Sequence, residues 1–168
     1  FILDGVGNPT DGSDAFTILP SLVQSKGKGS VTLASADPKT KPLINPNIFQ
    51  NESDYDVLIA GVKIARKIIA ASALDDLRGK EFLPGPAVQT DEEIKAYINK
   101  YIQTIYHPVG TCKMGNDEMA VVDHELRVHG IDGLRVADAS IMPTIINANT
   151  NAPTIMIGEK CADLIRRA

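Results

Sequence analysis

The 168-residue sequence has no tryptophan and only two cysteines, Cys112 and Cys161. Two cysteines are too few for the disulfide framework of a small secreted domain, so we expect two reduced, partly buried thiols. Apolar stretches such as residues 68–71 fall far short of the roughly 20 residues that span a bilayer. No charged segment followed by an apolar one, the pattern of a signal peptide, opens the chain. These absences favour a cytoplasmic protein without a transmembrane segment.

The sequence also lacks a block of basic residues. Its net charge is −4, from 17 lysines and arginines against 21 aspartates and glutamates. A nucleic-acid partner is therefore not expected, because binding to a phosphate backbone needs clustered positive charge. The composition, with 43% apolar and 23% charged residues, excludes a disordered tail, a fibre and a coiled coil.

Three segments carry the periodicity of amphipathic helices, namely residues 53–72, 90–105 and 153–166. Ser53 with Asp56, and Thr90 with Glu93, have the spacing of capping boxes at the first two helix starts. Pro153 suits the first position of the third helix, where a missing N–H costs nothing.

Strands are expected where apolar residues form short or alternating runs. These runs lie at residues 16–23, 30–35 and 134–137. Residues 36–50 contain three prolines, which exclude a helix and allow only an edge strand or an extended loop.

Several residue patterns indicate catalytic or metal chemistry only weakly. His107, Cys112, His124 and His129 lie within 23 residues, but only the last two histidines have a spacing typical of zinc ligands, so we expect no metal. Cys112 and His107 would suit a nucleophile and its base, yet nothing indicates an oxyanion hole. Ser140 lacks the glycines of a nucleophile elbow.

Asparagines alternate before the third helix, at Asn147, Asn149 and Asn151. Three amides are more than one helix N-cap needs. They are either an asparagine-rich turn with one cap, or part of a site for an anion or a polarised ring carbonyl at the helix N-terminus.

Three longer motifs change this picture. Residues 106–115 (YHPVGTCKMG), 133–143 (GLRVADASIMP) and 149–159 (NTNAPTIMIGE) resemble, in this order, segments of the glucose–methanol–choline (GMC) family of flavin-dependent oxidoreductases, with its choline-dehydrogenase-like members the most similar. The similarity extends upstream and covers nearly the whole chain past about residue 16. The resemblance implies oxidation of the CH–OH group of a small-molecule alcohol, with hydride transfer to FAD.

The same resemblance implies roles for individual residues. His107 would help to take the substrate hydroxyl proton, and Asn151 would be its partner in catalysis. An imidazole can accept such a proton at neutral pH, and a neutral amide can hydrogen-bond the substrate oxygen without competing for it. The cofactor-contacting positions implied are Tyr106, Asp138, Ala139, Asn149, Ala152 and Pro153.

The family's Gly-x-Gly-x-x-Gly motif for ADP is absent, and the chain begins at Phe1 rather than methionine. We therefore expect the C-terminal part of a longer enzyme, with FAD bound mainly by the missing N-terminal part. Its divisions would be an N-terminal loop (1–12), a substrate-binding domain (13–106) and a catalytic, flavin-contacting segment (107–168). The fold expected is α+β, an antiparallel sheet with helices on one face, plus a C-terminal strand and helix that belong to the FAD domain.

Such a fragment should be inactive alone. The apolar face of its last helix should be partly exposed, so that it self-associates or its tail is mobile. Two other functions remain open at this point: a hydroxynitrile-lyase-like enzyme on the same scaffold, and a non-catalytic binding module.

Overall fold

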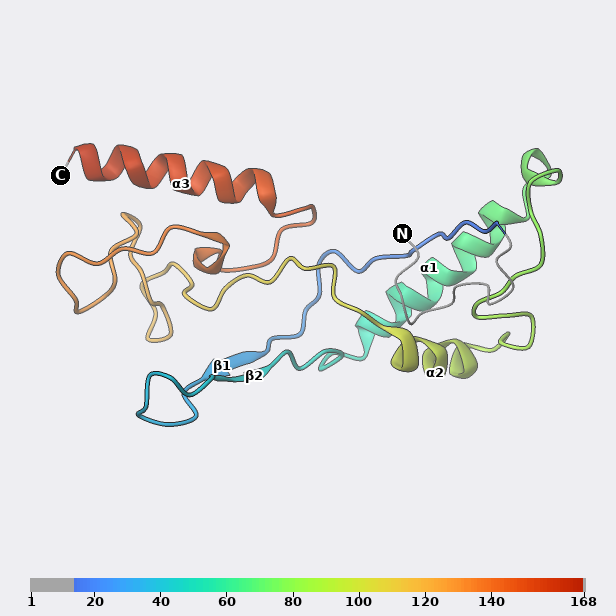
Figure 1. The fold of residues 1–168 in the computed structure, drawn as a ribbon, viewed down its shortest axis with the longest axis horizontal. Helices are drawn as coiled ribbons and strands as arrows, with labels where there is room; N and C mark the ends of the chain where they lie inside the picture. The colour runs from blue at the N-terminus through green and yellow to red at the C-terminus, as the bar shows by residue number, and fades with distance from the viewer. Residues whose placement is uncertain (1–13, 168) are drawn as a thin grey trace. The chain divides into compact units, whose positions relative to one another are not determined.

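The computed structural model describes residues 14–167, which form two compact units (Figure 1). Unit 1 consists of residues 14–22 and 51–105, and unit 2 of residues 23–50 and 106–167. The predicted N-terminal loop, residues 1–12, lies outside the described residues. The functional division at residues 106 and 107 stays a prediction, because the two units are defined by packing alone.

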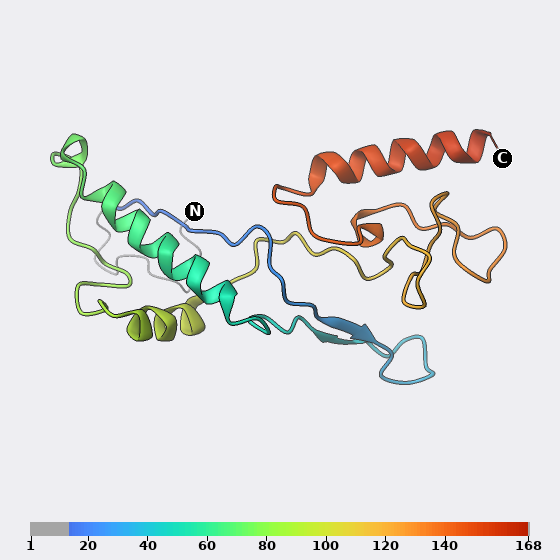
Figure 2. The ribbon, with the colours of Figure 1, turned by 180° about the vertical axis from the view of Figure 1, so that it is seen from behind.

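Unit 1 is built on two helices, α1 (Ser53–Ile69) and α2 (Asp91–Tyr101), with a short 3-10 helix, η1 (Ser72–Leu74), after α1. The two helices lie side by side (Figure 2). Their buried faces carry Leu58 and Ile59 on α1 and Ile94 and Ile98 on α2. Burial of such side chains stabilises the pair by about 1.5–3 kcal/mol for each residue relative to exposure.

The two predicted capping boxes have different outcomes. The box at Thr90 and Glu93 is confirmed, since each side chain bonds the backbone N–H of the other residue. The box at Ser53 is wrong: Asn51 Oδ1 accepts both the backbone N–H of Ser53, at 3.0 Å, and its hydroxyl, at 2.8 Å. Ser53 therefore lies inside the helix and is not its cap.

Both of these helices end earlier than predicted, α1 at Ile69 and α2 at Tyr101. Ile102 has an extended ψ of 136°, which stops α2 although the apolar periodicity continues to Ile105. The sequence pattern thus continues beyond the helix itself.

Unit 2 contains the sheet and the third helix. Strands β1 (Ser30–Thr32) and β2 (Leu43–Asn45) pair antiparallel, with Val31 opposite Ile44. A Cβ atom on Gly29 would lie 2.2 Å from the carbonyl oxygen of Asn45, so only glycine allows this approach. The α+β class and the antiparallel pairing are confirmed.

The larger part of unit 2 packs under helix α3 (Asn151–Arg166), which lies beside the loops of residues 106–142 (Figure 1). A second 3-10 helix, η2 (Ala139–Ile141), packs against α3. The buried core of this part comprises Val122, Leu126, Ile141, Met142, Ile157 and Cys161. Cys161 is a buried free thiol and Cys112 a half-buried one, as predicted.

Two predicted strands are wrong. Residues 16–23 form no strand, and residues 134–137 make only one isolated bridge, between Arg127 and Arg135. Isolated hydrogen bonds, such as that from the Val136 N–H to the Leu126 carbonyl (3.1 Å), hold residues 134–137 against a loop. No regular strand lies beside them among the described residues. Pro153 is also misplaced: α3 begins at Asn151, which makes Pro153 its third residue.

Candidate functional site

His107 follows a sharp backbone turn. Tyr106 has a positive φ of 63°, a conformation that few residues other than glycine adopt, and the residue is 72% exposed. Pro108 on the other side restricts the His107 backbone to extended conformations. His107 is half-buried, between an exposed tyrosine and a rigid proline.

The His107 ring is held by a threonine from the start of α3. Its Nδ1 atom lies 2.9 Å from Oγ1 of Thr150, which is only 7% exposed. The Thr150 carbonyl in turn accepts the N–H of Thr154 at 3.1 Å and its hydroxyl at 2.6 Å. This link joins the segment of His107 to the N-terminus of α3.

The asparagines and their neighbours lie at the same helix start. Asn149, Asn151 and Ala152 are exposed, and Pro153 is half-buried. The first turn of α3 has no acidic residue and no side-chain cap, whereas α1 and α2 both begin with carboxylates. Its positive dipole end and its first N–H groups are therefore left uncompensated by the described side chains.

Asp138 and Ala139 lie in a different local setting. The Asp138 carboxylate accepts the backbone N–H of Ser140 at 2.7 Å and so caps η2, and Ala139 packs against the core beneath α3. Among the described residues, neither hydrogen-bonds His107 or Asn151. The hydrogen bond between His107 and Thr150 thus brings the predicted site residues 106–107 to those at the start of α3. Residues 138–139 contact α3 through η2. The sequence did not indicate Thr150, because its contact is with a residue 43 positions away.

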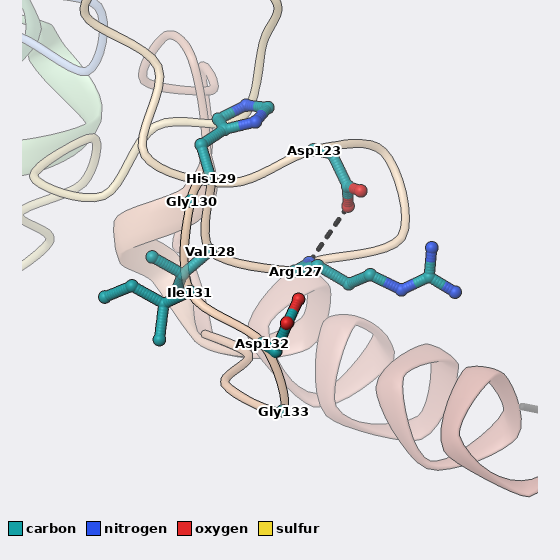
Figure 3. Close-up of a pocket in the computed structure, with 8 residues that line it drawn as sticks. All are labelled: Asp123, Arg127, Val128, His129, Gly130, Ile131, Asp132 and Gly133. Carbon is teal, nitrogen blue, oxygen red and sulfur yellow. Dashed lines mark hydrogen bonds between the residues drawn. The ribbon is translucent and has the colours of Figure 1, made fainter.

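One cavity is lined by none of these residues. It measures about 420 Å³ and is lined by Asp123 and residues 127–133 (Figure 3). The Asp123 carboxylate accepts the N–H groups of Glu125, at 2.8 Å, and Arg127, at 2.9 Å. Burial raises the pKa of Asp123, but these two bonds and the positive charge of Arg127 together hold the pKa below its ordinary value. The imidazole of His129 points away from Arg127 (Figure 3) and lies 3.0 Å from the Gly115 carbonyl.

No group of three possible metal ligands occurs in residues 14–167. His107 and His129 face different partners, Thr150 and Gly115, and His124 is exposed. Nor does any helix in this range combine the length and apolar character that a membrane span requires.

Residues 25–158 match the sequence profile of the GMC oxidoreductase family. The chain belongs to this family. It is 46% identical to choline oxidase from Arthrobacter globiformis over 166 residues, which is 96% of this chain and 30% of that protein. It is 52% identical to an oxygen-dependent choline dehydrogenase from Cronobacter sakazakii over 144 residues, 86% of this chain and 26% of that protein.

Solved structures agree. A pyridoxine 4-oxidase from Mesorbium loti is similar with a TM-score of 0.80 and 31% identity, over 87% of this chain and 28% of that chain. An FAD-dependent oxidoreductase from Chaetomium thermophilum gives a TM-score of 0.77 and 31% identity, over 83% and 24%. The chain thus spans between a quarter and a third of the length of the curated relatives it matches. The expected resemblance to the C-terminal part of GMC oxidoreductases is confirmed.

Proposed function

We propose that this chain is the substrate-binding and catalytic portion of an FAD-dependent oxidoreductase that oxidises the CH–OH group of a small, choline-like alcohol. The observation that carries the proposal is the hydrogen bond between His107 and Thr150, which ties a candidate base to an uncompensated helix N-terminus. The choline oxidase and choline dehydrogenase names of the relatives support the substrate class. Residues 13–106 would serve mainly for substrate binding and residues 107–168 for catalysis.

His107 is the proposed base. Its Nδ1 atom is occupied by Thr150, and its Nε2 atom has no hydrogen-bond partner among the described residues. Nε2 is therefore the nitrogen that can take the proton from a substrate hydroxyl. Half-burial limits the solvent around the ring while leaving it accessible.

Asn151 is the proposed partner of this base. It is the first residue of α3 and follows Thr150 directly, so its exposed amide starts from the same place as the His107 contact. The amide donates hydrogen bonds but does not take up protons at neutral pH. It can orient the substrate oxygen while His107 removes the proton.

The residues at the start of α3 fit a flavin. No carboxylate occupies the first turn, and the exposed Asn149, Asn151 and Ala152 leave the backbone approachable. A helix N-terminus stabilises negative charge. We propose that these residues bind the cofactor ring, and that Tyr106, Asp138, Ala139 and Pro153 also contact it. FAD, when bound, supplies the acceptor for the hydride.

The experiment is a chimera in which this chain replaces the matching segment of Arthrobacter globiformis choline oxidase. We expect the chimera to bind flavin and to transfer electrons from choline to an artificial acceptor. Replacing His107→Ala should lower turnover per bound flavin by at least about 100-fold. His124→Ala, an exposed histidine outside the proposed site, is the matched control and should retain activity.

Three results would contradict the proposal. Unchanged turnover in His107→Ala would remove this residue as the base. Release of an aldehyde from a cyanohydrin, without reduction of the acceptor by alcohols, would favour the hydroxynitrile-lyase-like alternative. A flavin-loaded chimera without any turnover would favour a binding module.

The 168-residue chain alone is expected to bind no FAD. It is also expected to self-associate through exposed apolar residues of α3 such as Ile155 and Ile165, which size-exclusion chromatography measures.

A further inference from the structure

We infer that Thr150 is a positioning residue for His107: its hydroxyl accepts a hydrogen bond from Nδ1–H and so keeps Nε2 as the basic nitrogen of the ring. The inference rests on the proposed function in one respect only, the role of His107 as the base. Its geometric part, the choice of tautomer, concerns the chain itself.

The Thr150 hydroxyl does not make the capping hydrogen bond that is usual at its position. Thr150 is the N-cap of α3, and a threonine there commonly accepts the backbone N–H of the second or third helical residue. Thr90 does so at the start of α2, where its hydroxyl accepts the N–H of Glu93, the third residue, at 3.2 Å. In α3 the third residue is Pro153, which has no N–H. The proline therefore removes one of the two N–H groups that the cap could take, the one that Thr90 uses in α2.

The Thr150 hydroxyl contacts His107 instead. Thr150 makes no capping bond with its side chain, and its Oγ1 lies 2.9 Å from Nδ1. The residue is 7% exposed, so water cannot easily replace this contact. The Thr154 backbone N–H donates to the Thr150 carbonyl at 3.1 Å, and this helical bond, which a valine at position 154 would keep, fixes the backbone from which the hydroxyl extends.

This contact determines which ring nitrogen of His107 can accept the substrate's hydroxyl proton. When the O–H bond of a substrate breaks, the oxygen keeps the electron pair and the proton goes to Nε2. The resulting imidazolium carries N–H groups on both nitrogens, so Nδ1 must donate, and Thr150 Oγ1 is the acceptor within reach. If the hydroxyl accepts from Nδ1–H before the transfer as well, neither group has to rotate. The opposite arrangement would leave a proton on Nε2 and block the reaction.

The test is nitrogen-15 NMR of the histidine rings in the 168-residue chain. The sequence has only three histidines, and His107→Gln assigns the signal by its loss. We expect Nδ1 of His107 to be protonated and Nε2 not. Thr150→Val removes the hydroxyl at nearly constant shape, and should shift the tautomers of His107 towards those of the exposed His124. Thr150→Ser should restore the original signal.

Thr154→Val is the matched control, because it removes the neighbouring hydroxyl from the same helix turn without touching His107. It should leave the tautomer of His107 unchanged. A protonated Nε2 in the unaltered chain would overturn the inference. So would a Thr150→Val chain whose amide spectrum shows a folded protein with an unshifted His107, or a Thr154→Val chain with the same shift as Thr150→Val.

In the choline oxidase chimera, Thr150→Val should lower kcat by at least about 10-fold with a smaller effect on KM, and Thr150→Ser should recover most of it. The two proposals fail separately. An active His107→Ala chimera together with the expected tautomer would remove the catalytic role and keep the positioning one. A His107 ring protonated at Nε2, together with an inactive His107→Ala chimera, would keep the catalytic role of His107 and remove the positioning role of Thr150.

Discussion

The hydroxyl of Tyr55 donates a hydrogen bond to Oδ1 of Asn99 over 2.6 Å, which joins the first turn of α1 to the last turn of α2. Tyr55 is 9% exposed. Replacing Tyr55→Phe deletes the hydroxyl and leaves the amide without its donor. We expect the free energy of unfolding to fall by about 0.5–1.5 kcal/mol, measured by urea denaturation.

Tyr101→Phe is the control for this change, because the hydroxyl of Tyr101 makes no hydrogen bond with any described residue. Its stability should stay within about 0.5 kcal/mol of the unaltered chain. Equal losses in the two variants would show that the hydrogen bond to Asn99 contributes nothing.

The capping box of α2 predicts a dependence of stability on pH. Bonds from the backbone N–H groups of Thr90 and Gln89 lower the pKa of Glu93 below its ordinary value of 4.5. A lowered pKa stabilises the folded state above pH 4.5, and this contribution is lost as the pH falls through the pKa of the folded state. Glu93→Gln should remove that part of the acid-induced loss.

Urea denaturation of Glu93→Gln between about pH 6 and pH 3 checks this prediction. Glu92→Gln changes the neighbouring carboxylate, which makes no hydrogen bond among the described residues, and should keep the full dependence. Thr90→Ala removes the cap itself and should cost about 1 kcal/mol at neutral pH. Parallel pH curves for Glu93→Gln and the unaltered chain would contradict the assignment.

Two glycines inside helices should respond oppositely to alanine. A Cβ on Gly61 of α1 would lie 2.7 Å from Cβ of Pro20, whose ring is rigid, whereas a Cβ on Gly158 of α3 would meet nothing within 4 Å. Gly158→Ala should stabilise the chain by about 1 kcal/mol, since alanine favours helix. Gly61→Ala should destabilise it, because overpacking costs about 1–3 kcal/mol. Thermal unfolding compares the two, and a higher Tm for Gly61→Ala would show that residues near Pro20 move away.

The core beneath α3 should depend on Ile141. This residue is 5% exposed, whereas Ile155 on α3 is 59% exposed. Ile141→Ala should lower the free energy of unfolding by about 2–5 kcal/mol, and Ile155→Ala should change it by less than about 0.5 kcal/mol. Denaturation followed by the NMR signals of unit 2 measures both. A small loss for Ile141→Ala would mean that this core rearranges to fill the cavity.

The fold was predictable where the determining contacts are local. Thr90 and Glu93 are three residues apart, so their capping box could be read from the sequence and was found. Ser53 had the same pattern, but it lies inside α1, and the side chain of Asn51, two residues earlier, accepts both its N–H and its hydroxyl. Residues 134–137 have the composition of a strand and lack a regular neighbour to pair with. Pairing between distant segments is the part that local patterns do not encode.

The candidate site was predictable to a different extent. His107 and Asn151 were singled out through the family resemblance, and their roles stay predictions. Thr150 could not be found in that way, because its importance depends on a contact across 43 residues of sequence. One local signal was present: a proline three residues after a threonine at a helix start removes one of the two N–H groups that the threonine could cap.

The composition of the two units has a consequence for refolding. The described part of unit 2 combines residues 23–50 with residues 106–167, on either side of the α1 and α2 segment. The two parts can meet only by closing a loop that contains all of residues 51–105, and the entropy cost of closure rises with the length of the flexible loop. If α1 and α2 form first, this loop is already shortened. We therefore expect the contact between residues 23–50 and residues 106–167 to appear after the contact between the two helices in a refolding experiment, and to be delayed further by changes such as Tyr55→Phe.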